Sequence, residues 1–92
     1  MIKIFRCKET EKLFNDQPSK RFATIIKVAR RKLEMLEAAN KLEDLRNPPG
    51  NRLELLKGNR AGQYSIRIND QFRICFRWVD NEAENVEIVD YH

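Results

Sequence analysis

The sequence predicts an α+β fold, with an N-terminal strand, two to three helices and then a four-stranded antiparallel meander that carries the helices on one face. Three patterns lead to this prediction. Apolar residues recur at the helical period between residues 19 and 39, they alternate with polar residues after Gly50, and the first seven residues alternate in the same way. With 92 residues and 41% hydrophobic content, the chain can form one small core, so we expect a single domain over residues 1–92.

The first half of the chain contains the N-terminal strand and the helices. Ile2 and Ile4 alternate with polar residues, which predicts a strand over residues 1–7. A short helix is expected over residues 9–14 and a long one over residues 19–39, where a single apolar stripe runs at helical spacing. Leu42 and Leu45 indicate a further helical turn, and segment 47–51 ends it because two prolines and a glycine do not continue a helix. The stripe consists of Phe22, Ile25, Ile26, Ala29, Leu33 and Leu36.

Four strands are expected in the second half, where the apolar residues switch to a period of two. Turns rich in glycine, asparagine and aspartate separate them, so consecutive strands are expected to pair as an antiparallel meander. Runs of strands that follow helices are typical of an α+β fold. The strands are expected around residues 53–55, 64–68, 72–78 and 86–88.

The register of the two central strands predicts a pair of facing arginines. If Ile66 and Ile74 share the buried face, the two strands turn around a three-residue loop, and Arg67 lies directly opposite Arg73 on the other face. Arg77 follows on the same face of the second strand. Because facing like charges destabilise a sheet, such a pair requires a neighbouring carboxylate or an anionic ligand.

Charge is unevenly distributed along the chain. Residues 52–78 contain six basic and two acidic residues, whereas residues 79–92 contain five acidic and no basic residues. A basic strip with an aromatic ring beside it is typical of an RNA-binding surface, because cations contact phosphates and rings stack on unpaired bases. The alternative is that the arginines simply solvate the open face of a one-sided sheet. The candidate RNA-binding residues are Arg52, Arg60, Tyr64, Arg67 and Arg77.

The last three residues, Asp90, Tyr91 and His92, bring together an acid, a phenol and the only imidazole of the chain. A terminal tripeptide often frays and is inert, which is the alternative interpretation. Together with Lys57 and Arg73, however, these groups match the requirements of metal-independent RNA cleavage. In that reaction the ribose 2′-hydroxyl attacks the adjacent phosphorus, one side chain removes its proton, another protonates the leaving 5′-oxygen, and cations stabilise the charge that develops.

Composition excludes several other classes of protein. The longest apolar run is three residues, whereas a transmembrane helix needs roughly twenty. The first residues lack the features of a signal peptide, so we expect a soluble protein of the cytoplasm. Cys7 and Cys75 have no CxxC partner and the chain has one histidine, so we expect reduced thiols and neither a metal nor another cofactor.

Five segments carry a family resemblance, namely 48–54, 56–62, 65–71, 73–76 and 86–92, and it extends over nearly the whole chain. They resemble the HigB branch of the RelE/ParE toxin superfamily. The resemblance implies a RelE-like fold and a bacterial type II toxin, a ribosome-dependent endoribonuclease that cuts messenger RNA in the A site of the 30S subunit. It also implies a HigA-type helix-turn-helix antitoxin, with contact to operator DNA only through the antitoxin complex, and no membrane partner.

The same resemblance implies roles for the candidate catalytic residues. Lys57 and Arg73 would stabilise the phosphate, while Asp90, Tyr91 and His92 would supply acid–base and positioning groups.

One position departs from the family pattern. Some members have a histidine where this chain has Glu54, so the acid–base work falls to Asp90 and His92 or to Glu54 itself. Two other functions stay open at this point. One is a ParE-like toxin that poisons DNA gyrase by protein contact, and the other is a weakly active toxin that serves mainly as the partner of its antitoxin.

Overall fold

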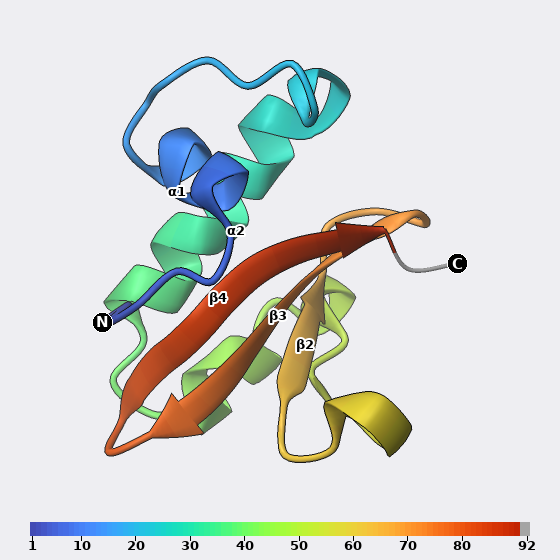
Figure 1. The fold of residues 1–92 in the computed structure, drawn as a ribbon. Coiled ribbons are helices and arrows are strands. Elements are labelled where there is room, and N and C mark those ends of the chain that lie inside the picture. Colours follow the sequence, from blue (N-terminus) through green and yellow to red (C-terminus); the bar gives the residue numbers. More distant parts are fainter. Residues whose placement is uncertain (91–92) are drawn as a thin grey trace.

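The computed structural model describes residues 1–90 and contains, within them, two α-helices and one four-stranded sheet. The helices are α1 (Lys8–Phe14) and α2 (Ile26–Ala38), and the strands are β1 (Glu54–Leu55), β2 (Tyr64–Arg67), β3 (Phe72–Val79) and β4 (Glu82–Asp90). The strands pair antiparallel in the order β1-β2-β3-β4. Both helices lie on one side of the sheet (Figure 1), so the predicted α+β meander is confirmed.

The N-terminal segment runs parallel to β4 along the edge of the sheet, but it makes only isolated bridges. Ile2 bridges Ala83 and Phe5 bridges Val86. Asn85 of β4 lies between the two bridged positions and has a left-handed backbone with φ of 53°. The sequence predicts a strand over residues 1–7, whereas the structure has two isolated bridges there. The left-handed residue in β4 interrupts the pairing between them.

The predicted long helix is shorter than expected. It begins at Ile26 rather than near Ser19, and a 3₁₀ turn over Ala23–Ile25 precedes it. The hydroxyl of Ser19 donates a hydrogen bond to Glu9 Oε1 at 2.9 Å, so it ties the loop to α1 instead of capping α2. Helical spacing nevertheless identified the buried positions correctly, because Leu33 and other residues of the stripe lie in the core.

The register predicted for the central strands is confirmed. Ile66 pairs with Ile74 and Arg67 with Arg73. The connecting loop is held by Asn69, whose Oδ1 accepts hydrogen bonds from the backbone N–H groups of residues 71 and 72 at 2.9 and 2.8 Å. This Asx-type loop closes the hairpin in the register that buries both isoleucines.

The last strand is longer than predicted and contains an irregularity. Its pairing with β3 shifts by one residue between Cys75 and Arg77 of β3, next to Asn85 of β4. An extra residue in one strand reverses the inward and outward alternation beyond it, so Ala83 and Val86 are both fully buried despite their odd spacing.

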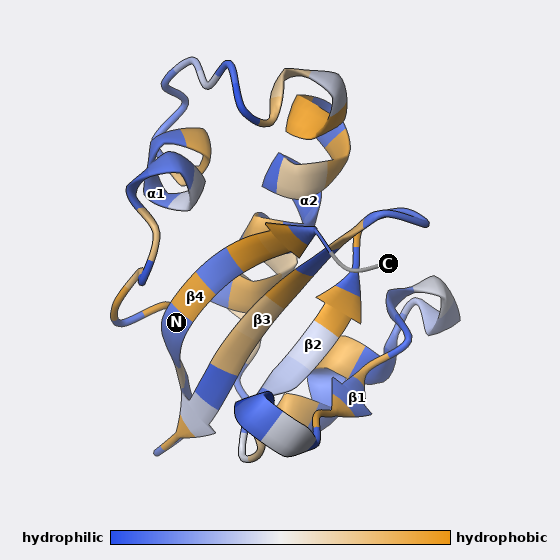
Figure 2. Cartoon of the chain, turned by 45° about the vertical axis from the view of Figure 1, so that its right-hand side comes forward, coloured by the Kyte–Doolittle hydropathy of each residue, from blue (hydrophilic) through white to orange (hydrophobic). Residues whose placement is uncertain are grey.

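The core lies between the helices and the facing side of the sheet. Figure 2 shows hydrophobic and hydrophilic residues alternating along β3 and β4, as expected when one face is buried. None of the helices within residues 1–90 is long and apolar enough to cross a membrane. Both cysteines are free thiols, as predicted. The largest fully buried apolar residues are Leu13, Phe22, Leu33, Leu36, Leu45, Ile66, Ile74, Phe76, Val86 and Ile88.

Candidate functional site

Arg73 lies on the sheet face that points away from the helices, yet only 8% of the residue is exposed. Its Nε donates a hydrogen bond to Ser65 Oγ at 2.8 Å, and its Nη2 donates to the carbonyl oxygen of Arg52 at 2.7 Å. Its Nη1 lies 3.6 Å from Glu54 Oε1. The guanidinium is therefore oriented by groups from β2, from β1 and from the segment that leads into β1.

The carbonyl that accepts from Arg73 is positioned by the residue before it. Asn51 is fully buried, and its Nδ2 donates to the carbonyl oxygens of Leu45 and Asn47 at 3.1 and 3.3 Å. Its Oδ1 accepts a hydrogen bond from Lys32 Nζ on α2, and burial lowers the pKa of that lysine. The sequence predicts only that segment 47–51 ends a helix, whereas the structure makes it the support of the candidate site.

The facing arginines each have a carboxylate neighbour. Arg67 forms an ion pair with Asp70 in the β2–β3 loop, and Arg73 lies beside Glu54. These two carboxylates are the only acidic residues of the sequence between positions 52 and 78. The like-charge repulsion predicted from the register is thus offset within the protein. The side chain of Arg67 is 30% exposed, so it remains open to solvent.

Glu54 is the carboxylate found next to the Arg73 guanidinium. It lies in β1, pairs with Ser65 of β2, and therefore shares the sheet face of Arg73. Its side chain is 51% exposed, whereas that of Arg73 is 10% exposed. A ligand on this face would reach Glu54 first, with the guanidinium behind it.

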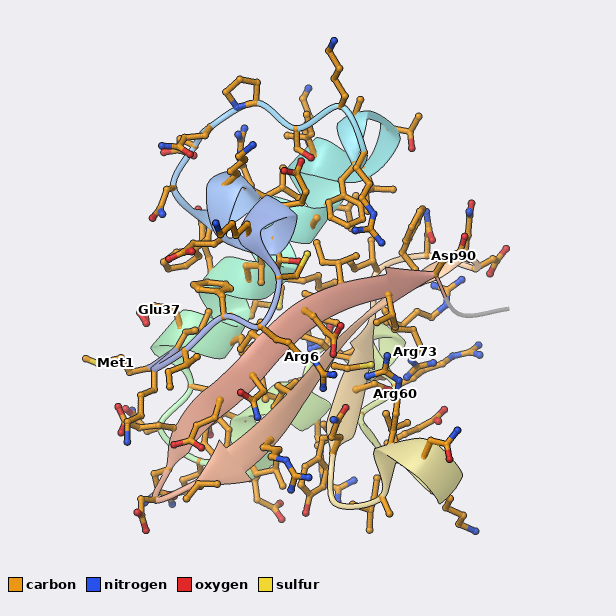
Figure 3. All side chains as sticks on the ribbon, viewed as in Figure 1. Met1, Arg6, Glu37, Arg60, Arg73 and Asp90 are labelled. Carbon is orange, nitrogen blue, oxygen red and sulfur yellow. The ribbon has the colours of Figure 1, made fainter. Side chains whose placement is uncertain are left out.

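Asp90 ends β4 at the same end of the sheet. It pairs with Phe72, next to the pair formed by Val89 and Arg73. Strand alternation assigns Asp90 to the face of Phe72 and Arg73 to the other face. The carboxylate accepts a hydrogen bond from Gln71 Nε2 at 3.0 Å. Figure 3 shows Asp90 at the tip of β4, beyond Arg73. The predicted catalytic residues Tyr91 and His92 lie outside the described residues.

Lys57 is exposed and precedes the 3₁₀ turn Gly58–Arg60 in the connection between β1 and β2. Gly58 has a left-handed φ of 66°, which suits glycine and fixes the direction of the turn. Within residues 1–90 the ammonium group makes no hydrogen bond or ion pair, so it is available to a ligand. Lys57 comes two residues after β1, the strand that carries Glu54.

Two of the predicted RNA-binding residues have different surroundings. Arg77 shares the face of Arg73 and is exposed, and its guanidinium lies against Gly62, where an added Cβ would be only 3.2 Å from Nη1. Tyr64, by contrast, lies on the face of β2 that also carries Ile66, and its ring stacks 6.2 Å from that of Phe76. Tyr64 is partly buried and packs against the core, so its ring does not lie on the face of the arginines.

Arg60 covers the centre of the sheet face. Its Nη1 lies 3.2 Å from Glu87 Oε2 and 3.1 Å from Gln63 Oε1. Cys75 is fully buried on this face, and burial raises the pKa of its thiol. The β1–β2 connection thus partly covers the sheet face opposite the helices. Arg60 and Arg73 are held by neighbouring groups, so they are not simply solvated side chains on an open face.

The groups around Arg73 suit phosphate chemistry. An oriented guanidinium stabilises negative charge on phosphate oxygens, and its low exposure strengthens that interaction. A carboxylate beside it can accept a proton from an attacking hydroxyl. Ser65 and Asn51, which hold the site together, were not predicted as site residues. The only signal in the sequence is a serine between the apolar positions of β2, which strand alternation alone does not distinguish from an ordinary exposed serine.

The fold is shared with toxin–antitoxin proteins of known structure. The chain resembles a chain of the crystal structure of the heterotetrameric YoeB-YefM toxin–antitoxin complex from Staphylococcus aureus, with a TM-score of 0.63, 26% identity, and coverage of 100% of this chain and 98% of that one. A second structure of a YoeB-YefM complex from the same organism gives a TM-score of 0.54 at 24% identity, with the same coverage. These likenesses support the RelE-like fold.

The sequence comparisons are more specific. Residues 3–92 match the model of the family described as RelE-like toxin of type II toxin-antitoxin system HigB. The chain is 46% identical over 83 residues to Toxin HigB-1 of Vibrio cholerae serotype O1, covering 88% of this chain and 87% of that protein. It is also 41% identical over 73 residues to an uncharacterized protein of Haemophilus influenzae, covering 79% and 72%. The protein therefore belongs to the HigB family of RelE-like toxins of type II toxin–antitoxin systems.

Proposed function

We propose that this toxin is a metal-independent endoribonuclease that cleaves messenger RNA bound to the ribosome. The observation that supports the proposal most strongly is Arg73, an almost buried guanidinium that is oriented by Ser65 and Arg52 and has Glu54 beside it. Fixed cations of this kind stabilise the charge of a phosphoryl transition state without reorganisation. The HigB family of the chain supports the same reaction class.

The proposed reaction transfers a phosphoryl group within the RNA, from a 5′-oxygen to the neighbouring 2′-oxygen. The 2′-oxygen of a ribose forms a bond to the adjacent phosphorus, and the bond from phosphorus to the 5′-oxygen of the next nucleotide breaks. Glu54 accepts the proton of the 2′-hydroxyl, and His92 supplies a proton to the leaving 5′-oxygen. Asp90 lies on the other face at the end of β4, so its proposed part in the acid–base work is to support His92 from there. Arg73 and Lys57 stabilise the negative charge on the other phosphate oxygens. The products are a 2′,3′-cyclic phosphate and a 5′-hydroxyl, and no metal ion is required.

The remaining predicted residues bind and position the RNA. Tyr91 positions the nucleotide at the cleaved bond, and the basic residues around the site contact flanking phosphates. Tyr64 contributes to the packing of the sheet through its ring contact with Phe76. The proposed phosphate-contacting residues are Arg52, Arg60, Arg67 and Arg77.

We further propose that the ribosome presents the substrate and that a HigA-type antitoxin neutralises the toxin in the bacterial cytoplasm. The candidate site lies on a sheet face and not in a deep cleft, so a substrate held in place by the 30S A site would remove the need for the toxin to fold the RNA itself. The likeness to YoeB-YefM toxin–antitoxin complexes supports an antitoxin partner.

The test is cleavage of a defined messenger RNA on purified translating ribosomes, with isolated messenger RNA as the comparison. We expect cleavage of the ribosome-bound message by the wild-type chain, and a large loss of cleavage for a chain that ends at Tyr91. Unchanged cleavage by that shortened chain would remove His92 from the mechanism. Absence of cleavage by the wild type, together with DNA gyrase-dependent linearisation of plasmid, would replace the proposal with gyrase poisoning. If the wild type neither cleaves messenger RNA nor slows growth when it is expressed without its antitoxin, the protein is an inactive toxin that serves as the antitoxin's partner.

A further inference from the structure

A second basic site lies beside Arg73 on the same sheet face. Arg6, Asn59, Arg60 and Gln63 line a polar hollow of about 320 Å³ between the N-terminal segment and the 3₁₀ turn Gly58–Arg60. Arg6 precedes α1 and donates its backbone N–H to the carbonyl oxygen of Val86, which fixes the N-terminal wall against β4. Two segments distant in the sequence therefore bring two guanidinium groups together.

The two guanidinium groups share a single carboxylate. Arg6 Nε lies 3.6 Å and Arg60 Nη1 lies 3.2 Å from the same oxygen, Oε2 of Glu87. The side chain of Glu87 is 16% exposed, whereas those of Arg60 and Arg6 are 34% and 61% exposed. The carboxylate thus lies beneath the two cations, and within residues 1–90 neither guanidinium is paired with a second carboxylate. Such a pair of guanidinium forks suits a phosphate, which both can bind in a bidentate manner.

The hollow is close to the candidate catalytic site. Glu87 pairs with Cys75, which is two residues along β3 from Arg73 and on the same face, a separation of about 7 Å. Both Arg60 and Arg73 act electrostatically on the Cys75 thiol, so both guanidinium groups lie near it. In Figure 3 the labelled Arg6, Arg60 and Arg73 lie close together across the middle of the sheet. A step of two residues along a strand is comparable to the spacing of successive phosphates along a nucleic-acid strand.

We propose that Arg6 and Arg60, with the side-chain amides of Asn59 and Gln63, form a second phosphate site that binds a phosphodiester of the RNA next to the one held by Arg73. The assignment rests on the proposed function for the identity of the substrate. When no RNA is bound, Glu87 forms ion pairs with both Arg6 and Arg60. A bound phosphate replaces part of that ion pairing. The sequence alone gives no indication that Arg6, near the N-terminus, binds RNA.

The experiment measures binding separately from cleavage. Full-length protein is titrated with a single-stranded RNA that carries 2′-O-methyl groups and cannot be cleaved, over a range of salt concentrations. Arg6→Gln is expected to lower the slope of log affinity against log salt by about 0.7, the value for one lost phosphate contact on a single strand. Glu87→Gln is expected to tighten binding, because it removes the competing carboxylate. Lys3→Gln is the matched control, since Lys3 lies in the same segment and pairs with Glu84 of β4 at 3.5 Å.

A second readout locates the site. Inorganic phosphate is titrated into protein labelled with ¹⁵N, and the Nε–H resonances of the arginines are followed. We expect shifts at Arg6 and Arg60 in the wild type and loss of the Arg60 shift in Arg6→Gln. The proposal is overturned if Arg6→Gln and Lys3→Gln have the same salt slope, or if Glu87→Gln weakens binding.

The outcomes separate this site from the proposed function. Binding at Arg6 and Arg60 without cleavage on ribosomes supports the phosphate site and overturns the nuclease. Cleavage on ribosomes with an unchanged salt slope in Arg6→Gln supports the nuclease and overturns the site. If an acidic peptide binds the hollow and RNA does not, the assignment to RNA is overturned.

Discussion

Replacing Ser65 with alanine tests whether the orientation of Arg73 is built into the sheet. Ser65 is fully buried, and its hydroxyl accepts a 2.8 Å hydrogen bond from Arg73 Nε. A hydrogen bond to a charged group contributes about 1.5–3 kcal/mol, so we expect Ser65→Ala to lower the free energy of unfolding by about 2 kcal/mol. For a domain of this size that corresponds to a fall in Tm of about 8–16 °C.

The effect on activity is expected to be larger than the loss of stability explains. Without the serine hydroxyl, the guanidinium keeps the Arg52 carbonyl and Glu54 as neighbours but loses one of the contacts that fix its plane. A misplacement of about 1 Å can reduce a rate by up to about 100-fold. We therefore expect messenger RNA cleavage on ribosomes to slow by roughly tenfold or more at a temperature where the variant is fully folded.

Ser19→Ala provides the matched control. Ser19 is also buried and donates a 2.9 Å hydrogen bond to a carboxylate, that of Glu9, but it lies in the loop before α2 and away from the site. Both variants are followed by thermal unfolding and by single-turnover cleavage. Equal cleavage rates for Ser65→Ala and Ser19→Ala, at equal folded fractions, would refute the assignment of Ser65 as a positioning residue.

Three further predictions follow from the same geometry. Glu54→Gln is expected to slow cleavage by about 100-fold or more while leaving the fold intact, because Glu54 is half exposed and acts as the proton acceptor; a normal rate would transfer that role to Asp90 or His92. Asn51→Ala is expected to destabilise the domain by about 2–4 kcal/mol in urea unfolding, since it leaves two carbonyls and Lys32 without their partner. Burial raises the pKa of the Cys75 thiol above its ordinary value of 9.0, so the folded state holds that proton more tightly than the unfolded state. Stability should then fall as the pH rises through and above about 9, and Cys75→Ala should remove that part of the pH dependence.

The sheet register was predictable because two local constraints agree. Strand alternation requires Ile66 and Ile74 on one face, and the three-residue loop after Ile68 gives the matching pairing, so the opposition of Arg67 and Arg73 followed from sequence. The irregularity in β4 was not predictable, because a left-handed asparagine inside a strand has no distinctive sequence signal.

The environment of Arg73 also could not be predicted from the sequence. Its contact with the Arg52 carbonyl depends on how the loop before β1 folds, and that loop is fixed to α2 by the hydrogen bond from Lys32 to Asn51. The late start of the predicted helix, at Ile26 instead of near Ser19, has a similar cause, because Ser19 finds a partner in α1. Contacts between segments that are distant along the chain leave no periodic pattern, so propensity and spacing do not reveal them.

The most direct test of the proposed mechanism uses a messenger RNA with a single 2′-deoxynucleotide on the 5′ side of the cleaved bond. On translating ribosomes, the wild-type toxin is expected to cut the all-ribose message to a 2′,3′-cyclic phosphate and a 5′-hydroxyl, and to leave the deoxy-substituted bond intact. Arg73→Ala is expected to cut neither message at a measurable rate. Equal cleavage of the two messages by the wild type, or normal cleavage by Arg73→Ala, would contradict attack by the 2′-hydroxyl at a site built around Arg73.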